Sequence, residues 1–275
     1  MPSLSASTLA LILVPLGACG GAATPPPERV ATTGAVSEDE FVRLHQLTEA
    51  EAPALRGETI DLGGSTAYLS LPEGAPPRAG VLVIHEWWGL NDHIRHWADR
   101  LAAEGYAALA IDLYGGRVAT TPEEAMALMR TVDEEAGVAI VRRGAQLLAE
   151  DPRVRAPRRA VIGWCFGGAW SLETALRVEG LDATVMYYGR TVEDPERLRA
   201  LGGPLLGIFG NLDTSIPPER VDAFDAALTE AGVTHEILRF DAPHAFANPS
   251  NAHYDHESAE AAWERTRAFL REHLR

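Results

Sequence analysis

Beyond about residue 57, short apolar runs alternate with longer segments in which apolar side chains recur every three or four positions. Apolar runs without polar alternation are typical of strands buried on both faces of a parallel sheet. They predict strands at 81–84, 107–111, 160–165, 183–188 and 205–209. We also expect a strand at 235–240 and an edge strand at 67–71. The periodic segments predict helices at 92–105, 122–150, 169–178, 217–231 and 258–274, the second of them broken near Gly137. This order predicts an α/β fold, a doubly wound, mostly parallel sheet with helices on both faces.

Composition narrows the classes of protein and partner. A length of 275 residues with 46% hydrophobic residues suits one globular domain plus extra sequence at one end. The formal net charge of −15 argues against nucleic acid as a partner, because the phosphates would be repelled. Apolar runs of the length of an ordinary membrane-spanning helix do not occur in the sequence. The net charge does not identify a partner, and composition does not define the oligomeric state, for which we favour a monomer.

The first 18 residues have features of an export signal. An apolar core at 9–16 ends in Leu16-Gly17-Ala18-Cys19, which resembles the lipobox of bacterial lipoproteins. The resemblance implies a lipoprotein signal peptide at 1–18 and lipidation of Cys19. The protein would then be exported and anchored by lipid to a bacterial membrane, on its periplasmic or outer face. The alternative is an uncleaved, unstructured N-terminus, because residues 1–8 lack the Lys or Arg of a typical signal.

Residues 19–56 have the composition of a tether, with three consecutive prolines at 25–27, which leaves 57–275 as the folded domain. A short helix at 41–47 could dock on that domain. Only Cys19 and Cys165 are cysteines, so lipidation of Cys19 would leave Cys165 without a disulfide partner. An unpaired thiol in an exported protein is open to oxidation, which favours a chemical role for Cys165.

Cys165 lies in the segment Gly163-Trp164-Cys165-Phe166-Gly167-Gly168, between a predicted strand and a predicted helix. This is the setting of the G-x-nucleophile-x-G elbow, in which a sharp turn presents the nucleophile and the helix-start amides face its target. Glycine fits beside such a strained turn because it lacks a Cβ. The alternative is a buried structural cysteine in a strand-to-helix turn.

Three further candidates follow predicted strands. Glu86 comes after 81–84, Asp213 after 205–209 and His244 after 235–240. The carboxyl ends of parallel strands meet at one edge of a sheet, and a thiol there needs a base and an orienting carboxylate. The order nucleophile, acid, histidine is that of α/β-hydrolases. Taken singly, Asp213 could be a turn residue, His244 a loop histidine and Glu86 a loop carboxylate.

These segments together resemble the dienelactone hydrolase (carboxymethylenebutenolidase) family, an α/β-hydrolase fold. The matching pieces are His85-Glu86-Trp87-Trp88-Gly89-Leu90-Asn91, Asp112-Leu113-Tyr114, Gly163-Trp164-Cys165-Phe166-Gly167-Gly168, Tyr187-Tyr188-Gly189, Gly210-Asn211-Leu212-Asp213 and Pro243-His244-Ala245-Phe246. The resemblance covers roughly 57–274. It implies cleavage of small esters or lactones through a thioester on the cysteine, without a cofactor.

The resemblance also implies the role of each site residue. Cys165 would be the nucleophile, His244 the base and Asp213 its orienter. Glu86 would keep the resting thiol neutral and help remove its proton once substrate arrives. The backbone N–H groups of Trp87 and Phe166 would form the oxyanion hole; two preorganised donors of this kind stabilise a developing negative charge.

The sequence departs from the family pattern where the substrate would bind. Dienelactone-cleaving members hold the substrate carboxylate with two arginines. One of them is displaced by about one position here, at Arg117, and the other is replaced by Asn248. We therefore expect no strong selection for a carboxylate. The aromatic candidates for an apolar pocket, or alternatively for the core, are Trp87, Trp88, Tyr114 and Phe246.

Two other functions stay open. A cysteine-elbow amidotransferase would need a His-x-Glu pair, and Phe246 follows His244 at that spacing. A non-catalytic, membrane-tethered binding module on a hydrolase scaffold would not need a complete Cys-Asp-His set. A metal site is disfavoured, because His253 and His256 have no third obvious ligand nearby.

Overall fold

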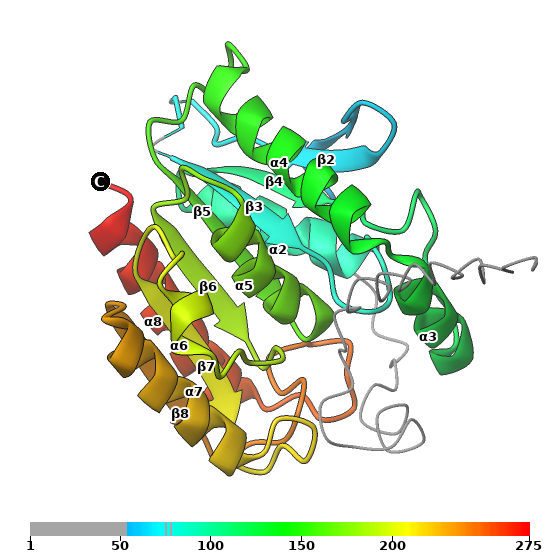
Figure 1. Cartoon of the computed structure of the whole chain (residues 1–275). Helices are drawn as coiled ribbons and strands as arrows, with labels where there is room; N and C mark the ends of the chain where they lie inside the picture. Colours follow the sequence, from blue (N-terminus) through cyan, green and yellow to red (C-terminus); the bar gives the residue numbers. More distant parts are fainter. Residues whose placement is uncertain (1–53, 75, 78) are drawn as a thin grey trace, which may run out of the picture.

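An eight-stranded sheet lies at the centre of the molecule, in the order β1-β2-β4-β3-β5-β6-β7-β8 (Figure 1). The computed structural model of the protein describes residues 54–74, 76–77 and 79–275. The predicted signal peptide, Cys19, nearly all of the tether and the helix expected at 41–47 lie outside the described residues. The strands are β1 (Glu58–Asp61), β2 (Thr66–Ser70), β3 (Gly80–Ile84), β4 (Ala107–Ile111), β5 (Arg159–Trp164), β6 (Ala183–Tyr187), β7 (Leu205–Gly210) and β8 (His235–Phe240).

Strands β3 to β8 run parallel to one another, while β2 pairs antiparallel with both β1 and β4. Every residue of β3, β4, β6 and β7 is buried. This burial explains the unbroken apolar runs in the sequence, because each of these strands is covered on both faces. The doubly wound, mostly parallel α/β sheet predicted from the sequence is therefore confirmed.

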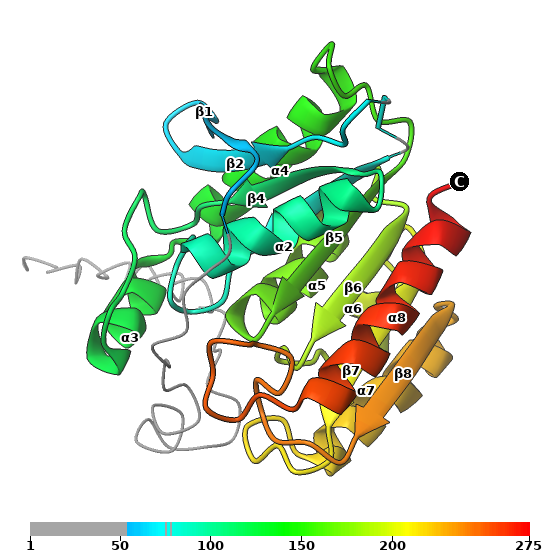
Figure 2. The same ribbon diagram turned by 180° about the vertical axis from the view of Figure 1, so that it is seen from behind.

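Helices cover both faces of the sheet. Helices α4, α5 and α7 cover the face of the sheet that is turned toward the viewer in Figure 1. Helices α2 and α8 cover the opposite face, which is seen in Figure 2. Trp97 of α2 ties this second layer together, since its ring stacks on Trp164 of β5 at 4.8 Å and also contacts Trp263 of α8 at 5.2 Å. The helices are α2 (Asp92–Ala103), α3 (Pro122–Thr131), α4 (Glu134–Glu150), α5 (Phe166–Arg177), α6 (Pro195–Leu198), α7 (Pro218–Ala231) and α8 (His256–His273).

Two details of the sequence prediction were wrong. The strand expected at the edge, 67–71, is β2, the second strand in; the edge is β1, a short and mostly exposed strand without an apolar run. The long helix breaks before Asp133, not at Gly137. Asp133 caps α4 by accepting from the N–H of Ala136 at 2.9 Å, as an N-cap residue does. Gly137 lies within α4, where a Cβ would collide with the ring of Trp170.

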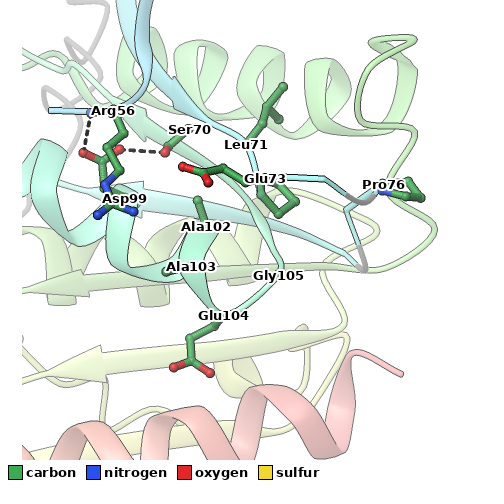
Figure 3. A pocket seen from close by; sticks show the side chains of 11 residues that line it. Arg56, Ser70, Leu71, Glu73, Pro76, Asp99, Ala102, Ala103, Glu104 and Gly105 are labelled. Atoms are coloured by element: carbon green, nitrogen blue, oxygen red, sulfur yellow. Dashed lines mark hydrogen bonds between the residues drawn. The ribbon is translucent and has the colours of Figure 1, made fainter.

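A cavity of about 470 Å³ lies beside the first strands and the end of α2 (Figure 3). Asp99 of α2 is buried at its wall and accepts hydrogen bonds from the Ser70 hydroxyl at 2.6 Å and the Tyr68 hydroxyl at 2.9 Å. The Arg56 N–H donates to the same carboxylate at 3.0 Å. This carboxylate therefore fixes the start of the described chain to the fold. Gly105, which also lines the cavity, lies just before the start of β4, so the cavity lies away from the carboxyl ends of the strands.

Candidate active site

The four candidate catalytic residues lie at the carboxyl ends of four parallel strands. Glu86 follows β3, Cys165 follows β5, Asp213 follows β7 and His244 follows β8. Strand order reverses between β3 and β5, because β4 lies on one side of β3 and β5 on the other. Ligand sites in open α/β sheets form at this switch point, at the carboxyl ends of the strands. All four side chains are buried.

The turn between β5 and α5 has the geometry expected of a nucleophile elbow. Cys165 adopts φ 55° and ψ −114°, a backbone conformation that non-glycine residues rarely take. At Gly167 a Cβ would collide with the backbone carbonyls of Ile84 and His85 at the end of β3. The close approach of helix to strand therefore requires glycine there, and it sets Cys165 beside the loop that carries Glu86.

Cys165, His244 and Asp213 form a buried series. The charge of the His244 ring acts on the Cys165 thiol, and His244 Nδ1 lies 2.6 Å from Asp213 Oδ2. The other oxygen, Asp213 Oδ1, accepts the backbone N–H groups of Ser215 at 2.7 Å and Ile216 at 3.1 Å. Both oxygens of the buried carboxylate are occupied, so the orientation of the histidine ring is fixed by the fold.

Glu86 belongs to the loop that follows β3. Its Oε2 accepts a hydrogen bond from Asn248 Nδ2, while Oε1 has no hydrogen-bond partner among the described residues. Its charge interacts with Cys165 and His244. A buried carboxylate oxygen without a partner is costly, and active sites are where such groups are retained.

Burial and mutual charge shift the pKa values of these groups. Burial raises the pKa of Glu86 to about 7, despite the opposing effects of His244 and Asn248. Burial would lower the pKa of His244, but the Asp213 carboxylate outweighs it and raises that pKa to about 10. Burial and the Glu86 charge raise the pKa of the Cys165 thiol. The site therefore favours a neutral thiol beside a protonated histidine ring at neutral pH.

Residues 65–274 match the dienelactone hydrolase family. The chain belongs to this family. A Saccharolobus solfataricus relative that carries carboxymethylenebutenolidase as a provisional name is 30% identical over 246 residues, covering 74% of this chain and 93% of the relative. As a member of the dienelactone hydrolase family, the protein is an ester or lactone hydrolase. Membership favours this function over an amidotransferase and over a non-catalytic binding module.

Solved structures of the dienelactone hydrolase type share the fold. A Klebsiella pneumoniae protein, provisionally named a dienelactone hydrolase, is 29% identical with a TM-score of 0.72, covering 80% of this chain and all of its own. A promiscuous phosphotriesterase of the dienelactone hydrolase type from metagenomic libraries is 28% identical with a TM-score of 0.68, covering 79% and 97%. The α/β-hydrolase fold is thereby confirmed.

Two residues near the site of this dienelactone hydrolase homologue were missed by the sequence prediction. His85 is buried beside Glu86, and its Nε2 accepts the Leu113 N–H at 3.1 Å. Its Nδ1, 2.5 Å from the Glu86 carbonyl, therefore carries the proton and donates it. Tyr188 follows β6 with φ 35°, and its ring contacts His244 at 5.0 Å. Position after a buried strand, the signal used for Glu86, could have identified both.

The predicted substrate residues take different positions. All four aromatic candidates are buried among the core side chains: Trp87, Trp88, Tyr114 and Phe246. That they contact the substrate stays a prediction. The Tyr114 hydroxyl has no hydrogen-bond partner among the described residues, and burial raises its pKa well above the usual value, so it is neutral. Arg117 is exposed, and its guanidinium donates to the Tyr114 carbonyl at 3.0 Å and the Thr131 hydroxyl at 3.2 Å.

In the part of the chain that the structure describes, no group of three or more His, Cys, Asp or Glu side chains is arranged to hold a metal ion. The helices of that part are all too short or too polar to cross a membrane.

Proposed function

We propose that the protein hydrolyses small esters or lactones through a thioester on Cys165. The observation that carries the proposal is the buried series Cys165–His244–Asp213 at a strained elbow, with the Glu86 carboxylate near enough for its charge to raise the pKa of the thiol. A thiolate is the reactive form of cysteine, and it needs a base to form and a cation to stabilise it. Glu86 supplies the base and the protonated His244 ring supplies the cation.

The steps follow from the protonation states of the site. Glu86 takes the Cys165 proton, and the thiolate attacks the carbonyl carbon of the ester to form a tetrahedral oxyanion. The N–H groups of Phe166 and Trp87 stabilise that charge. His244 donates its proton to the departing alkoxide as the C–O bond breaks, which leaves a thioester and a neutral ring.

The second half of the reaction restores the site. The neutral His244 takes a proton from water, and the hydroxide attacks the thioester carbonyl. The C–S bond breaks, the acid leaves, and the thiolate recovers its proton from Glu86. Asp213 stays ionised throughout, since its role is to orient the ring and stabilise its positive charge. The thiolate exists only during turnover, which protects it from oxidation between turnovers.

Hydrolysis of a neutral aryl ester by the full-length protein tests the proposal. Cys165→Ala should lower kcat/KM by at least about a thousandfold, because the reacting groups act as a unit. Cys19→Ala serves as the matched cysteine control and should keep kcat/KM within about twofold, since Cys19 lies outside the catalytic domain. More than a tenth of the activity surviving in Cys165→Ala would exclude covalent catalysis by this residue.

We also propose that Cys19 is lipidated and anchors the protein to a membrane facing out of the cytoplasm. The support is the apolar core at 9–16 and the lipobox-like Leu16-Gly17-Ala18-Cys19. Cys19→Ala should release the protein from the membrane fraction or block its processing. A wild-type protein that keeps Met1 as its N-terminus would refute the proposal.

A further inference from the structure

Asn248 is the hydrogen-bond donor that holds the Glu86 carboxylate. Its Nδ2 donates to Glu86 Oε2, and both side chains are buried, with 6% and 5% of their surfaces exposed. The two residues are 162 positions apart in sequence, so the contact joins the β3 loop to the loop between β8 and α8. A buried contact over such a sequence distance is fixed by the tertiary fold.

Ser250 determines which end of the Asn248 amide faces Glu86. The Ser250 N–H and hydroxyl both donate to Asn248 Oδ1, at 2.8 and 2.7 Å. A backbone N–H can only donate, so the amide oxygen must face Ser250 and the NH₂ group must face Glu86. The orientation of the amide is therefore set by the hydrogen bonds of the loop.

The loop itself is held at several points. The Asn248 N–H donates to the Ala245 carbonyl and the Asn251 N–H donates to the Asn248 carbonyl, each at 3.0 Å. Ala245, directly after the catalytic histidine, has φ 61°. The same short segment thus carries His244 and Asn248, and it fixes the position of Glu86 relative to the histidine.

We propose that Asn248, oriented by Ser250, is a positioning residue that holds Glu86 Oε2 and so directs Oε1 to take the Cys165 proton. The inference rests on the proposed thioester function. It adds a group that acts on Glu86 without touching the substrate. Being neutral, the amide can hold the carboxylate group in both its ionised and its protonated states, through which Glu86 passes in each turnover.

The groups that face Glu86 come from three neighbouring segments. His244 contributes a positive charge, Cys165 a thiol and Tyr188 a hydroxyl with no hydrogen-bond partner among the described residues. His244 and the Asn248 donor lower the pKa of Glu86, while burial raises it to about 7. Removing the donor should therefore raise this pKa further, and activity should then require a higher pH.

Asn248→Asp removes the donor and places a second carboxylate against Glu86, while an oxygen still faces Ser250; both changes raise the pKa of Glu86. The acid limb of the kcat/KM profile should move up by about one pH unit or more, the size expected for losing one hydrogen bond to a charged group. At high pH the variant should recover to within about fivefold of the wild type. Ser250→Ala should move the limb in the same direction by a smaller amount.

Gln146→Glu is the matched control. Gln146 donates from its amide to the Glu150 carboxylate on α4 at 3.1 Å, so the change puts two carboxylates together at an exposed position far from the loop. Its pH profile should coincide with that of the wild type.

The inference would be overturned if the acid limb of the kcat/KM profile stayed in place in folded Asn248→Asp. A loss of kcat/KM that is equal at every pH would also overturn it. If that variant does not fold, an unmoved limb in Ser250→Ala overturns it instead. Activity retained by Cys165→Ala would refute the proposed function. An essential Cys165 with an unmoved limb would refute only the role of Asn248.

Discussion

His244 Nδ1 lies 2.6 Å from Asp213 Oδ2, with both side chains almost entirely withdrawn from solvent. An ion pair in such surroundings is stabilised only where its remaining hydrogen-bonding capacity is met. Two backbone N–H groups, those of Ser215 and Ile216, meet it for Asp213. The pair keeps the His244 ring protonated beside the thiol, because the Asp213 carboxylate raises the pKa of His244 to about 10.

Substitutions in the pair should have unequal effects on turnover. His244→Ala should lower kcat/KM by roughly four orders of magnitude or more, because the ring both donates and accepts protons. Asp213→Asn should cost roughly one to two orders of magnitude less, since the orienting group transfers no proton itself. Steady-state kinetics on a neutral ester would check this. A larger loss for Asp213→Asn than for His244→Ala would contradict the assignment.

Glu86→Gln should stabilise the protein at alkaline pH while it abolishes the proton transfer. The pKa of Glu86 is raised from 4.5 to about 7, so its ionised form is disfavoured in the folded state. The cost is absent below about pH 4.5, grows between the two pKa values and is complete above about pH 7. It amounts to roughly 3 kcal/mol at most.

Urea denaturation at pH 5 and pH 8 would measure this effect. The gain from Glu86→Gln in the free energy of unfolding should be larger at pH 8 than at pH 5. Glu230→Gln, an exposed glutamate on α7, should show no such difference. A gain of the same size at both pH values would mean that the ionisation of Glu86 carries no cost in the fold.

A substrate carboxylate should give little advantage. Recognition of a carboxylate favours a fixed guanidinium, and the Arg117 guanidinium is engaged with Tyr114 and Thr131 while Asn248 is engaged with Glu86. The value of kcat/KM for a neutral aryl ester and for its carboxylate-bearing analogue should agree within about tenfold, or roughly 1.4 kcal/mol. A stronger preference for the carboxylate that Arg117→Ala removes would show that this arginine binds substrate.

Asp99→Ala should destabilise the fold without a specific effect on catalysis. The change leaves the Tyr68 and Ser70 hydroxyls and the Arg56 N–H without their buried acceptor, which costs about 2–4 kcal/mol. Asp92→Ala, at an exposed position of the same helix, should change stability by about 0.5 kcal/mol or less. Equal effects from both variants would contradict the role of Asp99.

The regular elements could be predicted because burial on both faces of the sheet leaves a strong signal. The five parallel strands β3 to β7 showed it, and β8, a partly buried strand at the other edge of the sheet, was also placed correctly at 235–240. The edge strand β1 could not be found in this way, because one short, exposed strand needs no apolar run. The helix break was misplaced because the glycine at 137 is a packing requirement of Trp170, whereas the cap at Asp133 ends the first helix.

Within the site, strand ends and chain order sufficed to bring Cys165, Asp213 and His244 together. The role of Asn248 could not be predicted in the same way, because its contact with Glu86 spans 162 positions. The sequence showed only that an arginine was missing there. The role of the Asn248 amide in place of that arginine is visible only in the folded loop, where Ser250 orients its NH₂ group toward Glu86.

Mass spectrometry of the protein during turnover tests the central claim most directly. Full-length protein is mixed with excess neutral ester, quenched in acid and weighed intact, and its peptides are then mapped. We expect one acyl group on the Cys165 peptide, released by neutral hydroxylamine as a thioester is, and absent from Cys165→Ala. An acyl group on any other residue, or undiminished turnover by Cys165→Ala, would contradict the account.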